Sequence, residues 1–268
     1  MIKYVFTVFL ILTITTIFAF DELWQKAQTI MENSKNYVPG TLAQHWESVT
    51  KKPGYEFRLG YEIIIGHALG EEGKTETSLI SRNTFDNYND LRNNPGIPRN
   101  DILDMRKAVD ELKSGINSIS NSMLNKDMDA EELDDRDILW TEIFTETDPK
   151  KLVLTPQKRD QNIGGNTCRV YKVRYMPDGK KKNSQTGTIY LDTVTGVPVL
   201  SVFDILDLGL PLEIKLPRNP EMRTYYSYDV ENNIAHPSRV EIKISIPFMG
   251  ITSEMNTMIT MGDYWERD

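Results

Sequence analysis

Cysteine is almost absent from this sequence: its 268 residues contain one, Cys168. A single thiol excludes an internal disulfide, so the stability of the chain must come from core packing. The 39% of hydrophobic residues is an ordinary globular value, and the length suits one large domain or two small ones. Cys168 lies in the strand-like segment NTCRVYKVRY, where we predict a buried and unreactive thiol.

Catalytic and metal-binding motifs are also lacking. The three histidines, His45, His67 and His236, share no metal-ligand spacing, and neither His-Glu-x-x-His nor Gly-x-Ser-x-Gly occurs. The acidic run DMDAEELDDRD has no glycine at the sharp-turn position of a calcium loop and no glutamate at its twelfth position. We therefore predict a protein that is not an enzyme, with no metal site and no cofactor.

Positive charge is in short supply as well, since 31 Lys and Arg face 39 Asp and Glu, for a net charge of -8. Binding to nucleic-acid phosphates needs a concentrated basic face, so nucleic acid is excluded as a partner. The short basic run GKKKN is predicted to be a charged hairpin tip, and any membrane contact through it would be peripheral.

The chain begins with MIKYVFTVFLILTITTIFAF, in which Lys3 precedes an unbroken apolar run and Ala19 stands just before an acidic segment. This pattern predicts a signal peptide over residues 1–19, cleaved after Ala19, and hence an exported protein. An uncleaved membrane anchor is the alternative. No cysteine stands near the cleavage point, so lipid attachment there is excluded.

Helical and extended patterns follow in turn. Residues 20–35 place Trp24, Ala27, Ile30 and Met31 at helical spacing. In residues 55–67 every second residue from Tyr55 to His67 shares one face, while Glu56, Arg58 and Glu62 share the other, which predicts a long strand. Residues 75–85 are expected to return as its partner.

Residues 86–150 have a different character. After a loop-like stretch, apolar residues recur at steps of three and four over residues 102–123, which predicts a helix with one narrow apolar stripe, capped by Asp101. A second helix is predicted within residues 127–144. We expect the stripe to pack on the protein's own sheet, with a coiled-coil partner as the alternative.

From residue 151 onward, seven strand-like segments are separated by short turns such as PDGK, TVTG and ENNIAHP. Short, even connections favour antiparallel pairing, so the predicted class is α+β with a large antiparallel sheet or an incomplete barrel. Strands flank the helical insert on both sides, and we therefore predict one domain over residues 20–268.

The segment DTVTG is similar to two catalytic signatures but matches neither. An aspartic protease needs Asp-Thr-Gly contiguous and twice, and a cation pump needs membrane helices and a nucleotide domain. We instead expect Asp192 to close a strand, Gly196 to adopt positive φ in the turn, and Pro198 to begin the next strand.

The order of these segments resembles the outer-membrane lipoprotein carrier and receptor superfamily, the LolA- and LolB-like proteins. The matching positions are Asp192, Thr195, Gly196 and Pro198 in a hairpin, Pro237 opening a later strand, and Tyr264 closing the last one. The match covers residues 187–265, and residues 20–85 support it through a helix followed by long strands. The insert at about 86–150 and the greater length depart from the carriers.

This resemblance implies an unclosed, strongly curved antiparallel half-barrel whose concave face is covered by helices, in a bacterial periplasm. Its apolar inner surface would hold acyl chains of a lipid or lipoprotein. The striped helix would then be a lid, formed by Met105, Val109, Leu112 and Ile116. The segment LDLGLPLEIKLP would be either an exposed apolar loop or a buried edge.

An acyl chain needs an apolar face rather than exact polar geometry, and alternation in the strands offers one. The candidate ligand-binding residues are Tyr61, Ile63, Ile65, Val240, Ile242, Ile244, Met255, Ile259 and Met261. Met258 is predicted to point to the opposite side. An ordinary core under the helices is the alternative for each of these residues.

These observations lead to two hypotheses. The first is a non-catalytic periplasmic protein that binds or carries an acyl-chain ligand, in the manner of outer-membrane lipoprotein sorting. The second is an envelope-stress sensor or assembly factor that uses the same fold for contacts with an envelope protein, through the helix at 102–123.

Overall fold

The computed structural model describes residues 22–69, 75–125, 142–180, 184–205, 220–248 and 251–266. The predicted signal peptide, the acidic run at 127–137 and the apolar segment at 206–217 lie outside these residues. None of the helices in the described ranges is both long and apolar enough to span a membrane.

The architecture is an 11-stranded sheet with a few helices. Along the sheet the strands follow the order β4-β3-β2-β12-β11-β10-β9-β8-β7-β5, with β6 pairing β7. Their bounds are β2 (Thr41–Lys52), β3 (Tyr55–Leu69), β4 (Thr75–Asp86), β5 (Leu152–Pro156), β6 (Gln161–Ile163), β7 (Asn166–Tyr175), β8 (Gln185–Asp192), β9 (Pro198–Asp204), β10 (Glu221–Asp229), β11 (Ile234–Phe248) and β12 (Ile251–Gly262). The strand order ends in β4 on one side and β5 on the other, so the sheet is open, and the predicted α+β class with a large antiparallel, unclosed sheet is confirmed.

Six further elements lie in the described residues. The helices are α2 (Glu22–Asn33), α3 (Tyr88–Leu91) and α4 (Arg99–Asn125), with a short 3-10 turn at Ser34–Asn36. Strands β1 (Tyr37–Val38) and β13 (Trp265–Glu266) pair with each other in a separate ribbon.

The chain divides into two compact units. The first, here called the α2 unit, comprises Met1–Lys35, Leu139–Val202 and Tyr225–His236. The second, the α4 unit, comprises Asn36–Ile138, Phe203–Thr224 and Pro237–Asp268. Strands β9, β10 and β11 each contribute residues to both units, which explains why no linker signal marks the division in the sequence.

In the α2 unit, the residues predicted to form one face of the first helix are all buried: Trp24, Ala27, Ile30 and Met31. The Trp24 ring stacks on Phe144 with centroids 5.2 Å apart, and Tyr171 of β7 lies 5.5 Å from it. After the helix ends, the Ser34 hydroxyl accepts a hydrogen bond from the Ala235 amide at 2.9 Å. The helical period of the sequence therefore positions an aromatic core.

Cys168 lies in the same unit on β7 and is fully buried, as predicted. Burial, assisted by the negative charge of Asp192, raises the pKa of its thiol to about 11. A protonated, enclosed thiol is a poor nucleophile, so Cys168 acts as a small core residue.

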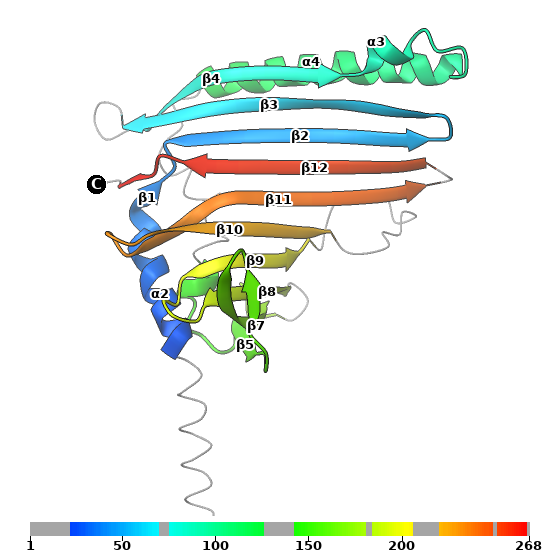
Figure 1. The fold of residues 1–268 in the computed structure, drawn as a ribbon. Helices are drawn as coiled ribbons and strands as arrows, with labels where there is room; N and C mark the ends of the chain where they lie inside the picture. The colour runs from blue at the N-terminus through cyan, green and yellow to red at the C-terminus, as the bar shows by residue number, and fades with distance from the viewer. Residues whose placement is uncertain are drawn as a thin grey trace, which may run out of the picture. The chain divides into compact units, whose positions relative to one another are not determined.

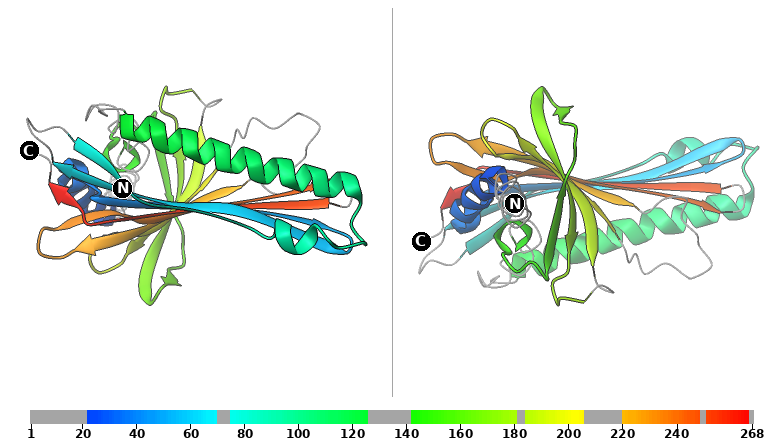
Figure 2. Two further views of the ribbon diagram at one scale, coloured as in Figure 1. Left: turned by 90° about the horizontal axis from the view of Figure 1, so that it is seen from above. Right: turned by 90° about the horizontal axis from the view of Figure 1, so that it is seen from below.

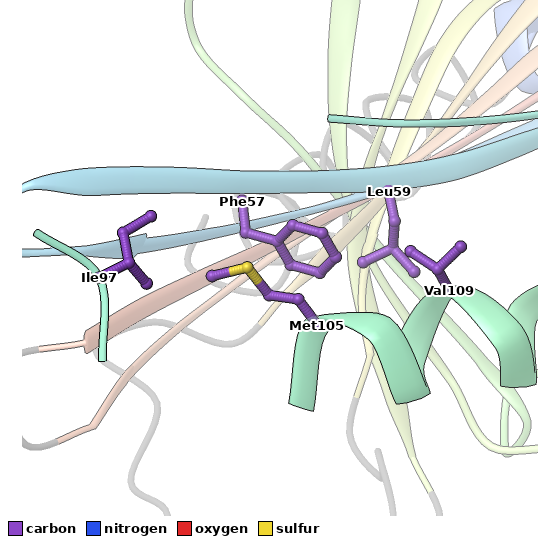
Figure 3. Close-up of a cluster of buried hydrophobic side chains, with 5 residues drawn as sticks. All are labelled: Phe57, Leu59, Ile97, Met105 and Val109. Carbon is purple, nitrogen blue, oxygen red and sulfur yellow. The ribbon is translucent and has the colours of Figure 1, made fainter. Parts of the chain in front are cut away.

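In the α4 unit, the striped helix packs on the sheet, and the expected packing on the protein's own strands is confirmed. Figure 3 shows Met105 and Val109 of α4 meeting Phe57 and Leu59 of β3, with Ile97 beside them. One to two turns further on, Ile116 packs against Ile63 and Ile65. The stripe is thus occupied by intramolecular contacts along β3.

Asp101 does not cap α4, contrary to the sequence prediction. The helix begins at Arg99, and the carbonyl of Pro98 already accepts a hydrogen bond from the amide of Ile102. Asp101 lies in the first turn and binds the Tyr55 hydroxyl at 2.7 Å and the Lys52 ammonium at 2.9 Å. These hydrogen bonds from Tyr55 and Lys52 lower the pKa of its carboxyl, so Asp101 ties the start of α4 to the β2–β3 hairpin.

The Asp192 turn has the predicted form. The Asp192 carboxylate accepts hydrogen bonds from the amides of Val194 and Thr195 and from the Thr195 hydroxyl, at 2.8–3.0 Å. Gly196 has φ +81°, and a Cβ placed on it would lie 2.7 Å from the Cβ of Lys26 in α2. The glycine therefore serves both the turn and the close approach of α2, and Asp192 is a structural residue.

Candidate functional site

Strand register places all nine candidate residues on one face of the α4 unit. Figure 1 shows β3, β2, β12 and β11 side by side, and antiparallel partners in adjacent strands point to the same side. The register aligns the rows Ile63–Gln44–Ile259–Val240, Tyr61–Trp46–Thr257–Ile242, Leu59–Ser48–Met255–Ile244 and Ile65–Leu42–Met261. We call this surface the apolar face.

Burial on the apolar face changes from strand to strand. On β3, which lies under α4, Ile63 and Ile65 are 4% and 7% exposed. Val240 on β11 is also buried. The other six candidates are half-buried: Tyr61, Ile242, Ile244, Met255, Ile259 and Met261.

The width of the helix explains why α4 does not cover the half-buried residues of β12 and β11. A helix with its side chains is about 10–12 Å across, and strands lie about 4.8 Å apart, so one helix covers roughly two strands. Five strands of this unit, β4, β3, β2, β12 and β11, lie next to one another in the sheet, and α4 packs on β3 and β4 (Figure 2). Among the described elements, α4 therefore leaves much of the face on β12 and β11 without close cover.

Two polar side chains on the apolar face bind each other. The Gln44 side-chain amide donates a hydrogen bond to the Tyr61 hydroxyl at 2.9 Å. The Trp46 ring stacks on Tyr61, with centroids 5.7 Å apart. Burial raises the pKa of Tyr61, only partly offset by the bond from Gln44, so its hydroxyl stays neutral. The middle of the face is thus an amphipathic, uncharged surface.

The opposite face of the same strands is charged. Lys51 pairs with Glu254 at 2.9 Å, and Arg58 pairs with Glu47 at 3.5 Å. Met258 lies on this side, directly opposite His45 in the register, and is 38% exposed. The prediction that Met258 points away from Met255 and Met261 is therefore confirmed.

The four residues proposed as a lid lie on one side of α4. Met105, Val109 and Ile116 are buried against β3, and Leu112 is half-buried between the same two clusters. An exposed apolar residue of this helix, Leu103, lies off the stripe and is 54% exposed. The stripe itself faces the sheet and not the solvent.

The histidines are scattered. His45 stacks on Phe85 at 5.5 Å, and His67 lies 3.3 Å from the Thr77 hydroxyl. Burial lowers the pKa of both His67 and His236. Within the described ranges, no group of three or more His, Cys, Asp or Glu residues is close enough to hold a metal ion.

Sequence reasoning missed the strand in the middle of this face. β2 contributes Leu42 and Trp46 to it, between β3 and β12. Its signal was weak because the alternating positions Leu42, Gln44, Trp46 and Ser48 include two polar residues. The aromatic residue Trp46, which lies between Gln44 and Ser48 in this alternation, was the available indication of a strand.

Pro237 and Tyr264, which were mapped onto the resemblance, are joined in the structure, although β11 begins at Ile234 and Pro237 does not open it. The Tyr264 hydroxyl donates a hydrogen bond to the carbonyl of Pro237 at 2.6 Å. This bond connects the segment after β12 to the neighbouring β11.

Comparison with known proteins finds similarity only at the level of solved structures. No protein-family model matches the chain, and no curated protein matches it. The chain is similar to the LolA superfamily protein NE2245 from Nitrosomonas europaea, with 11% identity, 90% of this chain and 94% of that chain covered, and a TM-score of 0.27. It is also similar to a DUF1329 family protein from Desulfovibrio piger, with 10% identity, 91% of each chain covered and a TM-score of 0.29.

A third similar structure is the MucA/MucB complex of Pseudomonas aeruginosa, with 8% identity, 92% of this chain and 99% of that chain covered, and a TM-score of 0.21. The resemblance to LolA-like proteins thus has a counterpart among solved structures. At identities of 8–11% and TM-scores below 0.5, these similarities establish no family and no function for this chain.

Proposed function

We propose that this protein is a non-catalytic, exported protein of the periplasm that binds an acyl chain, from a lipid or a lipoprotein, on the apolar face of the α4 unit. The observation that carries the proposal is the register, which gathers nine apolar candidates from three strands on one face while six of them stay half-buried.

The energetics of such a site need no directional contacts. Burial of each methylene contributes about 0.8 kcal/mol, so a segment of ten methylenes contributes about 8 kcal/mol before the cost of ordering the chain is subtracted. Met255 and Met261 add flexible thioethers, which adapt to ligands of variable shape. A micromolar affinity therefore needs only partial cover of the chain.

The proposed contact residues fall into two groups. Ile242, Ile244, Met255, Ile259 and Met261 are half-buried on β11 and β12 and would meet the ligand directly. Ile63 and Ile65 are under α4, so they would join the site only if α4 moves as a lid, and Tyr61 stands between the two groups. In this proposal the Asp101 contacts with Lys52 and Tyr55 hold the first turn of the lid in place.

Two methionines on the same strand provide the test. Met255→Glu places a charge on the apolar face, whereas Met258→Glu places the same charge on the opposite, charged face. The affinity of the mature protein for a fluorescent fatty acid is measured by titration. It should fall at least about tenfold in Met255→Glu, because a carboxylate opposes burial of the acyl chain. Met258→Glu should bind as the parent does.

Three outcomes decide between the hypotheses. The proposal is supported if the parent protein binds fatty acid and only Met255→Glu loses this binding. Equal loss in both variants, or no binding by the parent and no added lipid mass when the protein is released gently from cells and weighed intact, would overturn it. The second overturning outcome would favour the protein-contact hypothesis.

A further inference from the structure

A candidate site lies in the α2 unit, whereas the apolar face belongs to the α4 unit. It is a cleft of about 550 Å³ between α2, the turn at residues 146–149 and strand β5. Clefts of roughly 300–1,000 Å³ are the size that holds small ligands. Every lining residue belongs to the α2 unit, so this site does not rest on the function proposed above.

One side of the cleft is apolar and rigid. Leu152, Leu154 and Pro156 alternate along β5 and so share one face of the strand, and Pro156 is opposite Tyr171 in the register. Trp24 and Tyr171 contribute to the lining while remaining 2% exposed, because the rest of each ring is fixed in the aromatic core. Leu152 and Leu154 are half-buried, which leaves aliphatic surface for a ligand.

The remaining lining is largely polar, and its charged residues are Glu146 and Asp148. It consists of Gln25 and Gln28 from α2, together with Glu146, Thr147 and Asp148 from the turn. Among the described residues that line the cleft there is no lysine or arginine. A ligand that enters it therefore meets both carboxylates and amides and an aliphatic and aromatic surface.

The carboxylates are held by the turn itself. Glu146 accepts a hydrogen bond from the Asp148 amide at 2.8 Å, and its other oxygen lies 3.5 Å from the Lys151 ammonium. One carboxylate oxygen of Asp148 accepts a hydrogen bond from the Lys150 amide at 2.8 Å. The second Asp148 oxygen has lone pairs available to a donor in the cleft.

We infer that this cleft binds a small amphiphile whose head group is a protonated amine and whose body is a short aliphatic chain. The amine would donate hydrogen bonds to the Asp148 carboxylate and to the glutamine amide oxygens. The aliphatic chain would lie along Leu152 and Leu154 over the Trp24 edge. An anionic amphiphile of the same length would be repelled by Glu146 and Asp148.

Three ligands of equal chain length test the charge preference: octylamine, octanol and octanoate. Each is titrated into isotopically labelled mature protein at neutral pH, and the shifts of the Trp24 indole and the Gln25 and Gln28 side-chain amides are followed by NMR. Octylamine should bind most tightly and octanoate most weakly. Octanoate binding as tightly as octylamine, or no saturation by any of the three, would overturn the inference.

Conservative variants test the residues. Glu146→Gln together with Asp148→Asn keeps the acceptors of the turn but removes both charges, and should weaken octylamine binding about fivefold while leaving octanol unchanged. The matched control, Asp178→Asn with Glu231→Gln, removes two charges elsewhere in the α2 unit, where Asp178 likewise accepts from a backbone amide. Equal effects in both pairs would refute the assigned role of the turn.

The aliphatic wall is tested separately. Leu154→Ala should weaken the binding of octylamine and of octanol by the same factor, about threefold, because both ligands lose the same apolar contact. An unchanged affinity for both would show that the chain does not lie on β5. Because Met255 belongs to the α4 unit, failure of the fatty-acid test would leave these amine titrations unaffected, and the two proposals can fail independently.

Discussion

The two units have the same amphipathic patterns, but one of them forms a closed core and the other leaves part of an apolar face half-buried. In the α2 unit, Phe144, Ile189 and Leu191 are at most 1% exposed, and aromatic rings from the helix and the strands fill the core. In the α4 unit, one helix packs on the first two strands of a five-stranded face, and apolar residues of β11 and β12 stay half-buried. A single helix closes a core of small width and leaves a wider apolar face accessible.

The largest expected effect lies in the closed core. Phe144→Ala removes a ring that is 1% exposed and stacked on Trp24, and should lower the free energy of unfolding by about 3–5 kcal/mol. Urea unfolding followed by circular dichroism measures it. A loss under about 1 kcal/mol would mean that the α2 core can collapse around the cavity, and the contrast between the units would weaken.

A smaller effect is expected where α4 meets β3. Met105→Ala leaves a cavity beside Phe57, and should cost about 2–3 kcal/mol of unfolding free energy. Leu103→Ala on the same helix is the control, and since Leu103 is 54% exposed its change should stay within about 0.5 kcal/mol. Similar losses for both would contradict the assigned orientation of the helix.

Two glycines sharpen the comparison further. Gly196→Ala should destabilise the α2 unit by about 1–3 kcal/mol, because Gly196 has φ +81° and α2 lies close to it. Gly115 in α4 has open space around it, so Gly115→Ala should stabilise the helix by about 0.5–1 kcal/mol. Thermal unfolding of the two variants should therefore shift in opposite directions, and shifts of the same sign would contradict this account.

The smallest effect concerns the pH dependence of the Asp192 turn. Desolvation opposes ionisation of Asp192, but the hydrogen bonds from Thr195 and Val194 outweigh it, so the pKa of the carboxyl lies below its ordinary value of 3.8. A carboxyl with a lowered pKa stabilises the folded state above the unfolded pKa and loses that contribution as pH falls through the folded one.

Asp192→Asn should therefore be less stable than the parent at pH 6, and the difference should shrink as pH falls below 3.8. Urea midpoints at several pH values measure this. A difference that stays constant down to pH 2 would show that the charge of Asp192 contributes nothing to the turn.

The sequence predicted most elements because their periodicity is strong. The stripe of α4, the alternation of β3 and the Asp192 turn each depend on local chemistry, so the order of residues alone specifies them. β2 was missed because its Gln44 and Ser48 interrupt the apolar alternation, and because one of its two neighbours, β12, comes from a distant part of the chain. Register with β3 and β12, and not local preference, makes it a strand.

The candidate site was predictable in part, for the same reason. Alternation within each strand assigned the sides correctly, including the opposite orientation of Met255 and Met258. Alternation could not predict which residues of the face the helix covers. Ile63 lies under α4, while Ile259 in the same cross-strand row is half-buried. The amine cleft was not foreseen, because Trp24, Leu154 and Asp148 come from separate segments that only the fold brings together.

The most direct test of the acyl-binding account is to find where a chain lies. A fatty acid with a photoreactive diazirine near its methyl end is bound to the mature protein, irradiated, and the labelled peptides are sequenced by mass spectrometry. The account predicts labels on Met255, Ile259 or Ile244, on the apolar face. Labels concentrated on Met258 and its charged side, or spread evenly over the surface, would contradict it.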